Sequence, residues 1–286
     1  MNPIVKTMSL EKDLLKIANV ENNCAIPISK KSIFNNCVQD HRGNVKYALL
    51  GDSKASALFP GLLKNSSSNR WMFIGNFAPV ISDSIVYKHL KQTSELAIDF
   101  VAKNKNIEVV VLTTAVRNLF QLPANSDQSI EALPSSLNYE VAFDGLKNTV
   151  EKFTKYGKKI VITVDNPTLP NPRDCLDRTT AIPLINNIFN KYKNSNCNLS
   201  YTKHLELSKQ YLTLLLKLKE LYPFLEIYDP AYILCDIKND LCPSFRNNNF
   251  LYSYSDHISN YSNNLIGKEV ISLIENIQYK RIYSTK

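Results

Sequence analysis

The chain has 286 residues, of which 44% are hydrophobic and 21% are charged. This length suits one large α/β domain, and this composition excludes a chain that is disordered throughout. The net charge of +8 comes from scattered Lys and Arg residues without a basic run, so we expect no nucleic-acid partner. No stretch of about 18 apolar residues is present that could span a membrane. The first residues also lack the apolar core of an export signal, and the chain is compatible with a piece of a longer protein.

Apolar runs and amphipathic stretches alternate along most of the chain, which predicts alternating strands and helices. We expect strands at residues 45–50, 71–74, 107–112, 159–164 and 224–228. We expect helices at residues 55–63, 84–104, 136–156, 201–222 and 264–278. This alternation indicates a doubly wound, mostly parallel sheet in a three-layer α/β/α sandwich. Residues 1–44 are polar and rich in Asn and Lys, and we expect them to form an N-terminal extension that wraps the domain of residues 45–286.

The first predicted strand leads into the sequence GDS at residues 51–53, and a predicted helix follows. Ser53 would then lie at the carboxyl end of a strand and at the start of a helix, beside free backbone N–H groups. Several hydrolase folds present a serine nucleophile in this way. A turn that caps the helix through Asp52 or Ser53 fits the same residues. The choice between these two interpretations depends on a base elsewhere in the chain.

The later strands also end in polar residues, where a parallel sheet binds its ligands. These strand ends carry Gly75 and Asn76, Thr113 to Asn118, Asp165 to Pro167, and the loop after Asp229. The chain has no phosphate-binding glycine motif and no C-x-x-C pair. We therefore expect no nucleotide cofactor and no metal site.

Four histidines could supply the base for Ser53. His257 lies in a polar loop just before the last predicted helix, from which its ring could reach a site at the sheet edge and take a proton. His89 and His204 lie within predicted helices, on faces that we expect to be exposed or at a boundary, and His41 lies in the extension. His257 is therefore our candidate base.

The six cysteines leave the redox compartment open. Their even number and loop-like surroundings fit disulfides and an oxidising compartment, whereas six reduced cysteines in the cytosol fit the count equally well. Cys235 and Cys242 flank a short polar loop, which is a plausible small closed loop.

Four sequence blocks occur in an order that resembles a known family. The blocks are GDSKASALFP at 51–60, DNPTLPNPRDCLDR at 165–178, DPAYILCDIKNDLC at 229–242 and LYSYSDHIS at 251–259. A GDS turn after the first strand and a histidine before the last helix resemble the SGNH (GDSL-like) hydrolase superfamily. The ordered blocks, over residues 45–267, are more similar to the SGNH domain attached to membrane acyltransferase-3 proteins, which O-acylate cell-surface polysaccharides.

The resemblance implies a flavodoxin-like SGNH fold and a role for each residue that matches the family blocks. Ser53 would be the nucleophile and His257 its general base. Gly75 and the backbone N–H of Ser53 would stabilise the oxyanion, and Asn118 or Thr113 would supply the side chain of the superfamily's third block. The resemblance also implies an extracytoplasmic protein, periplasmic or at the cell surface, with the disulfides Cys235–Cys242 and Cys24–Cys37.

Two positions depart from the family pattern. Lys54 follows the serine where the branch usually has histidine, and Tyr254 stands where the family has the aspartate that orients the histidine. The nearby carboxylate is Asp256, but adjacent side chains in an extended segment point apart. Three arrangements therefore remain: Asp256 orients His257 through a different loop, a backbone carbonyl does so, or the site is weakened or inactive.

We expect an enzyme that transfers an acyl group, such as acetyl, to hydroxyls of a surface polysaccharide or oligosaccharide. Ser53 would accept the acyl group, and the partner would be a membrane acyltransferase-3 domain in the same chain or another, so that the domain is tethered through a part outside this sequence. A stand-alone SGNH carbohydrate acetyl esterase is one alternative. A catalytically weakened glycan-binding domain is the other.

Overall fold

The structure is a computed structural model, and it describes most of the chain. The described residues are 20–21, 24, 36–40, 44–66, 70–84, 88–121, 138–170, 197–247, 249–254 and 256–284. Among these residues, no helix combines the length and the apolar character needed to cross a membrane. Cys175 and His41 lie outside the described residues.

A seven-stranded sheet forms the middle layer, in the order β1-β2-β4-β3-β5-β6-β7. Its strands are β1 (Val20–Glu21), β2 (Cys37–Asp40), β3 (Tyr47–Gly51), β4 (Trp71–Ile74), β5 (Val109–Thr113), β6 (Lys159–Thr163) and β7 (Glu226–Tyr228). The strands from β4 to β7 run parallel, and β2 and β1 join the edge antiparallel. Counted from β3, the parallel strands have the flavodoxin-like order 2-1-3-4-5. The predicted doubly wound sheet is confirmed.

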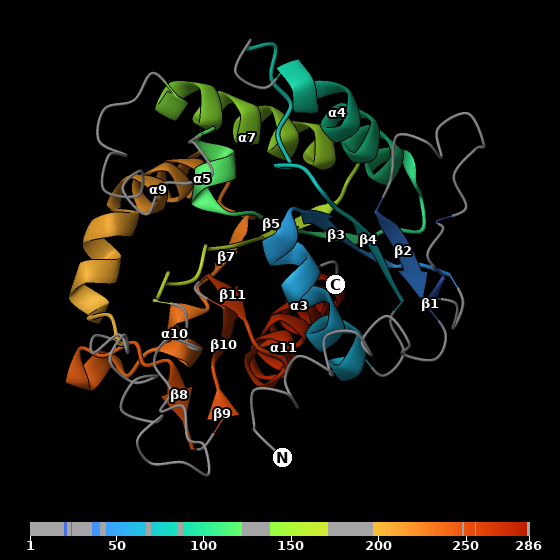
Figure 1. Ribbon diagram of the computed structural model, residues 1–286. Coiled ribbons are helices and arrows are strands. Elements are labelled where there is room, and N and C mark those ends of the chain that lie inside the picture. The colour runs from blue at the N-terminus through green and yellow to red at the C-terminus, as the bar shows by residue number, and fades with distance from the viewer. Residues whose placement is uncertain are drawn as a thin grey trace, which may run out of the picture.

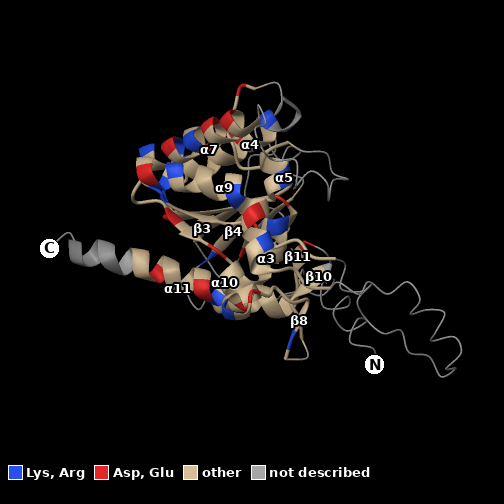
Figure 2. Cartoon of the chain, turned by 90° about the vertical axis from the view of Figure 1, so that its left-hand side faces the viewer, with Lys and Arg blue, Asp and Glu red and all other residues tan. Residues whose placement is uncertain are grey.

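Helices cover both faces of the sheet (Figures 1 and 2). One face carries α4 (Lys88–Lys103), α7 (Asn138–Lys155) and α9 (Tyr201–Leu221), and the other carries α3 (Ser53–Asn65), α10 (Ala231–Leu234) and α11 (Asn260–Ser284). Successive side chains of a strand point to opposite faces, so Ala48 and Leu50 of β3 enter the first core while Tyr47 and Leu49 enter the second. Burial on both sides explains the unbroken apolar runs of the central strands.

The segment that we expected to wrap the domain contributes strands to the sheet. In β2, Cys37 and Val38 pair with Ile74 and Phe73 of β4, and a disulfide joins Cys37 to Cys24. Sequence periodicity did not predict β2, because a four-residue edge strand is too short to show alternation.

The sequence patterns also did not predict several short elements after β7. They are α10, η4 (Ile237–Asn239) and two hairpins. The hairpins are made by β8 (Phe245–Arg246) with β9 (Asn249–Phe250) and by β10 (Tyr252–Tyr254) with β11 (His257–Ile258). A further short helix, α5 (Val116–Leu119), follows β5. Each of them spans four residues or fewer, and this is below the length at which a helical or strand period can be recognised.

Two glycines let α3 and α11 approach each other closely. A Cβ built on Gly61 would lie 1.8 Å from the backbone oxygen of Asn263, and one built on Gly267 would lie 2.4 Å from the carbonyl carbon of Gly61. The two backbones are therefore in direct contact. Because α3 begins at Ser53 and α11 follows β11, which begins at His257, this contact helps to set where the two predicted catalytic segments lie.

Candidate active site

Ser53 is the first residue of α3, and its side chain is exposed. The helix is capped by the preceding residue, since Asp52 Oδ1 accepts a hydrogen bond from the Lys54 N–H at 2.9 Å. Of the two capping residues that the sequence allowed, the structure thus uses Asp52. The Ser53 hydroxyl is left at the N-terminal end of α3, where the helix dipole favours negative charge.

Asp52 also joins the turn after β3 to the segment after β5. Its Oδ2 accepts hydrogen bonds from the Thr114 hydroxyl at 3.0 Å, from the Ala115 N–H at 2.9 Å and from the amide of Asn118. These two strands flank the point at which the strand order reverses, where doubly wound sheets bind their ligands. The structure therefore brings Asn118 to the Ser53 turn through the buried Asp52 carboxylate.

Asp256 contacts the ring of His257 although the two residues are adjacent. Asp256 Oδ1 lies 2.6 Å from His257 Nδ1, and both side chains are buried. Asp256 lies in the turn that precedes β11, and the pairing of β10 with β11 is irregular at this point. The rule that neighbouring side chains of an extended strand point apart does not hold in a turn. This contact corresponds to the first of the three arrangements considered above.

Asp256 is held in its ionised form. Burial by itself raises the pKa of this carboxyl, but the hydrogen bond with His257, the charge of Lys54 and the hydrogen bond from Arg117 together hold the pKa well below its usual range. A carboxylate can only accept a hydrogen bond, so we infer that His257 Nδ1 carries the proton and donates it. In the neutral ring, Nε2 then holds the lone pair, as a general base requires.

Lys54, Arg117, Asp165 and Asp256 form a charged cluster. Lys54 lies at its centre and is buried, with a relative exposure of 4%. Its Nζ lies 2.8 Å from Asp165 Oδ1 and 3.6 Å from Asp256 Oδ2, and it donates to Asn166 Oδ1 at 3.3 Å. It also donates to the backbone carbonyl of Asp256. One side chain thus ties the start of α3 to the end of β6 and to the turn before His257.

Arg117, on α5, is the second cation of the cluster. Its guanidinium donates from Nη1 to Asp256 Oδ2, while Asp165 Oδ2 accepts from the Val116 N–H at 2.9 Å. Two cations and two carboxylates therefore neutralise one another in a largely buried group. Neither Lys54 nor Arg117 was predicted from the sequence as a partner of Asp256. The sequence offered only weak signs of these contacts. Lys54 is a lysine beside the candidate serine, and Arg117 lies in the polar segment that follows a strand.

The candidates for oxyanion binding occupy three different environments. The Gly75 N–H donates to the Asn36 carbonyl at 2.9 Å, and the amide of Asn118 donates to Asp52. Thr113 is buried, and its hydroxyl accepts from Thr163 at 2.6 Å. A part in oxyanion binding stays a prediction for Gly75 and Asn118. In the part of the chain that the structure describes, no group of His, Cys, Asp or Glu side chains is arranged to hold a metal ion.

Both expected disulfides are confirmed. Cys235 is bonded to Cys242, and Cys24 is bonded to Cys37. Cys197 is also disulfide-bonded. None of the described cysteines is free.

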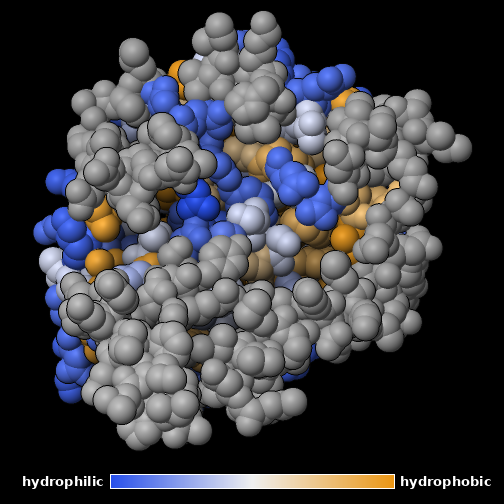
Figure 3. All heavy atoms as spheres, viewed as in Figure 1, coloured by the Kyte–Doolittle hydropathy of each residue, from blue (hydrophilic) through white to orange (hydrophobic). Residues whose placement is uncertain are grey.

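The surface around the start of α3 has a mixed character. In Figure 3, hydrophilic and hydrophobic side chains lie next to each other at the middle of the face, where α3 and α5 lie in the matching view of Figure 1. β11 contacts α3, so the Asp256–His257 turn belongs to the same region as Ser53. The geometry therefore places an exposed serine at a helix start near a buried, oriented Asp–His pair.

Comparison with solved structures finds similar proteins of low sequence identity. The periplasmic domain of a lipopolysaccharide acetyltransferase from Salmonella ser. Paratyphi A has a TM-score of 0.58 at 18% identity, over 96% of this chain and 97% of that chain. A GDSL-like lipase from Bacteroides thetaiotaomicron has a TM-score of 0.44 at 11% identity, over 97% of this chain and 99% of that chain. The C-terminal catalytic domain of Streptococcus pneumoniae peptidoglycan O-acetyltransferase A has a TM-score of 0.40 at 12% identity, over 82% of this chain and 96% of that chain.

Sequence comparison identifies the family. No curated protein matches the chain. The profile of the family described as "SGNH domain (fused to AT3 domains)" matches residues 23–272. This match covers most of the chain, including the Ser53 turn, the Lys54 cluster and the Asp256–His257 turn. The chain therefore belongs to the family of SGNH domains that are fused to AT3 domains.

Proposed function

We propose that this domain transfers an acyl group, such as acetyl, to hydroxyls of a carbohydrate, with Ser53 as nucleophile and His257 as general base. The contact between Asp256 Oδ1 and His257 Nδ1 at 2.6 Å carries the proposal. It supplies an oriented base beside the helix that begins with Ser53. An exposed serine, a histidine and a carboxylate that fixes its tautomer are the parts of a catalytic triad.

The reaction then has two half-steps. Ser53 Oγ attacks the carbonyl carbon of the acyl donor while its proton passes to His257 Nε2, and that proton passes to the donor's leaving group as an acyl-serine ester forms. A carbohydrate hydroxyl next attacks the ester, giving its proton to His257. The sugar leaves with the acyl group, and Ser53 recovers its proton from His257.

Asp256 stabilises the imidazolium that forms in each half-step. The carboxylate stays ionised because its pKa is held low by His257, Lys54 and Arg117, against the effect of burial. We assign Lys54 and Arg117 as positioning residues that act through Asp256. The oxyanion would bind at the N-terminus of α3, where each donor contributes on the order of 3 kcal/mol. Gly75 could take part only after its N–H leaves the Asn36 carbonyl.

The family description supports the choice of a transferase with an extracytoplasmic location. Its members are fused to AT3 domains, so the partner would be a membrane acyltransferase-3 domain that delivers the acyl group. The lipopolysaccharide acetyltransferase domain with the same fold is periplasmic. The disulfides are typical of an oxidising compartment. The acceptor would be a surface polysaccharide or oligosaccharide.

An acetyl esterase is the second candidate, because the exposure of Ser53 would let water replace the sugar hydroxyl. The contact between Asp256 and His257 argues against the third candidate, a weakened glycan-binding domain. Both enzymatic candidates use the same acyl-serine ester. They differ in the acceptor that breaks it down.

Two serines near the start of α3 allow a matched test. Ser53 and Ser56 are both exposed. We expect Ser53→Ala to abolish labelling by a fluorophosphonate probe and to lower turnover of an aryl acetate ester at least about a thousandfold, while Ser56→Ala leaves both unchanged. Products made with and without an oligosaccharide acceptor then separate transferase from esterase. Labelling or turnover that survives Ser53→Ala would refute the nucleophile.

A further inference from the structure

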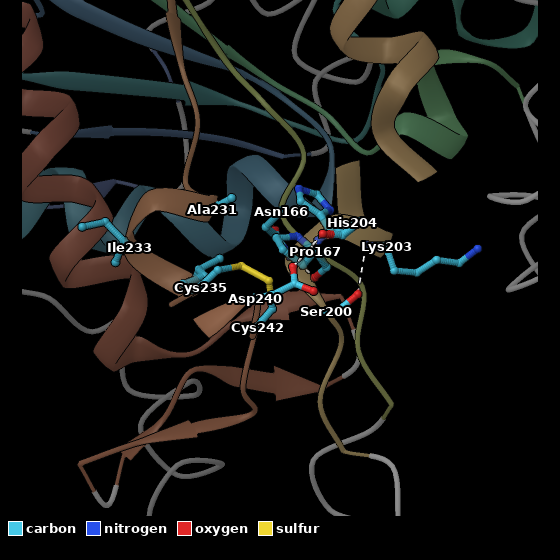
Figure 4. The surroundings of a disulfide bond; sticks show 12 residues. Asn166, Pro167, Ser200, Lys203, His204, Ala231, Ile233, Cys235, Asp240 and Cys242 are labelled. Carbon is cyan, nitrogen blue, oxygen red and sulfur yellow. Dashed lines mark hydrogen bonds between the residues drawn. A yellow bond between two sulfur atoms is a disulfide. The ribbon is translucent and has the colours of Figure 1, made fainter. Parts of the chain in front are cut away.

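A cavity lies next to the charged cluster, beyond the carboxyl ends of β5 and β6. Its polar lining includes Arg117, Asp165, Asn166, His204 and Ser208. Arg117 and Asp165 belong to the charged cluster of the candidate active site. The other wall is the first part of α9, which carries His204 and Ser208. Figure 4 shows His204 in the same region as Asn166 and Pro167.

His204 is buried, so the prediction of an exposed or boundary face was wrong. Its relative exposure is 4%. Within the described part of the chain, its Nε2 has no hydrogen-bond partner. A buried polar atom without a partner is uncommon in folded proteins and calls for an explanation. A ligand in the cavity would provide one.

Ser208 contacts both the backbone carbonyl and the ring of His204, and these contacts favour one ring tautomer. Ser208 Oγ donates its single hydrogen to the His204 backbone carbonyl at 2.7 Å, and the same Oγ lies 3.2 Å from His204 Nδ1. Both contacts are satisfied together when Nδ1 carries the ring proton and donates it to Oγ, so we infer this tautomer. Nε2 then presents a lone pair to the cavity. Burial and the nearby charge of Lys54 lower the pKa of His204 to about 4, so the ring is neutral at physiological pH.

These groups select the chemistry of a ligand. A neutral Nε2 accepts a hydrogen bond from a hydroxyl and gives no attraction to an anion. Arg117 can donate, and Asp165 and Asn166 offer oxygen atoms nearby. A mixture of donors and acceptors around a small cavity suits the hydroxyls of a polyol. We propose that this cavity is a subsite for a neutral hydroxylated ligand, in which His204 Nε2 accepts a hydrogen bond from a ligand hydroxyl.

If the proposed function holds, the ligand is the sugar that accepts the acyl group. The subsite adjoins Arg117, which contacts Asp256, so a sugar bound there would lie beside the predicted catalytic pair. The start of α9 is fixed by the disulfide loop shown in Figure 4. Leu199 and Cys242 exchange backbone hydrogen bonds at 3.1 and 2.7 Å, and Asp240 accepts from Thr202. The wall that carries His204 is therefore held in place.

Variants at His204 test the subsite through acceptor kinetics. We expect His204→Leu to raise the KM for an oligosaccharide acceptor by about fivefold or more, while fluorophosphonate labelling of Ser53 stays within about twofold. His204→Gln, which keeps an acceptor atom, should recover part of the loss. An unchanged acceptor KM in His204→Leu would overturn the subsite.

Stability distinguishes a binding role from a structural one. His204→Leu removes the Nε2 atom, which has no partner in the described part of the fold, and the 3.2 Å contact of Nδ1 with Ser208, whose hydroxyl keeps its bond to the backbone carbonyl. The thermal midpoint at neutral pH should therefore stay nearly unchanged. A large fall in the midpoint, together with slower labelling, would mean that His204 is structural. That result would overturn the proposal.

Direct binding keeps the subsite testable if the proposed function fails. The ¹⁵N resonance of His204 Nε2 in the wild-type domain should have the position of an unprotonated nitrogen. It should shift when methyl glucoside, methyl galactoside or methyl mannoside is added, and glucuronate should have a weaker effect. No shift with any of the three glycosides at their highest soluble concentration would overturn the subsite, whether or not Ser53 is labelled.

Discussion

Lys54 shows how one residue can connect parts of the chain that are distant in sequence. It follows the candidate nucleophile, is buried, and contacts Asp165, Asn166 and the Asp256 turn. A buried lysine is costly unless it is paired and hydrogen-bonded, and here both conditions are met. A change at this position should therefore affect both the stability of the fold and the predicted base.

We predict that Lys54→Met lowers the free energy of unfolding by about 3–5 kcal/mol, because Asp165 and Asp256 lose their shared buried cation. Loss of this cation should favour proton uptake by the coupled Asp256–His257 pair, so the acid limb of the pH–rate profile should move to higher pH. Lys54→Arg should recover part of both effects. Denaturant unfolding and the rate profile measure them.

Lys64, which is exposed near the end of the same helix, provides the control. Lys64→Met should change stability by less than about 0.5 kcal/mol. Equal effects of the two substitutions would contradict the positioning role of Lys54.

At the scale of elements, the crossing of α3 and α11 controls how the two ends of the predicted site meet. Gly61 and Gly267 bring the backbones into contact, and Asn263 Nδ2 donates to the Ala57 carbonyl at 3.1 Å across the interface. α3 begins at Ser53, and α11 follows the strand that begins at His257. A shift at this crossing should therefore move the serine relative to the histidine.

We predict that Gly267→Ala destabilises the protein by about 1–3 kcal/mol or more, because the new methyl group would meet the α3 backbone. Labelling of Ser53 should slow at the same time. Lys268→Ala, at the exposed neighbouring position on α11, is the matched control and should change neither property. Unfolding curves and labelling rates report the two effects, and normal labelling in Gly267→Ala would show that the crossing does not set the site geometry.

At the scale of the whole molecule, the pH dependence of stability should reflect His204. The unfolded chain takes up a proton near pH 6.5, whereas the folded protein does so only near pH 4. The unfolded state therefore binds more protons between these values, so the free energy of unfolding rises with pH across this window. The contribution of His204 to this free energy is fully present above pH 6.5 and is lost as the pH falls toward 4.

We predict a loss of about 3 kcal/mol from pH 7 to pH 4 that is attributable to His204, since each unit of pKa shift corresponds to about 1.4 kcal/mol. His204→Gln should remove this part of the slope. Lys54 opposes protonation, and Arg117 and Asp165 line the same cavity. The depressed pKa of Asp256 keeps that carboxyl ionised in the window. Denaturant unfolding at several pH values measures the slope, and an unchanged slope in His204→Gln would contradict its origin in this ring.

The sequence by itself determined the layered α/β fold, the parallel sheet and the place of Ser53. These features depend on local patterns, because apolar runs form buried strands, amphipathic stretches form helices, and a GDS turn must lie where one meets the other. The ordered blocks also indicated the disulfides Cys235–Cys242 and Cys24–Cys37 through the family resemblance, and the structure contains both.

Only the tertiary structure decided how His257 is held. A turn lets Asp256 reach the adjacent ring, and Lys54 meets Asp256 across a separation of 202 residues. The burial of His204 depends on how α9 packs beyond the sheet edge. None of these contacts follows from periodicity, because periodicity shows which face of an element is buried but not which residues meet there. For the same reason, the partners of buried charges appear only after the chain has folded.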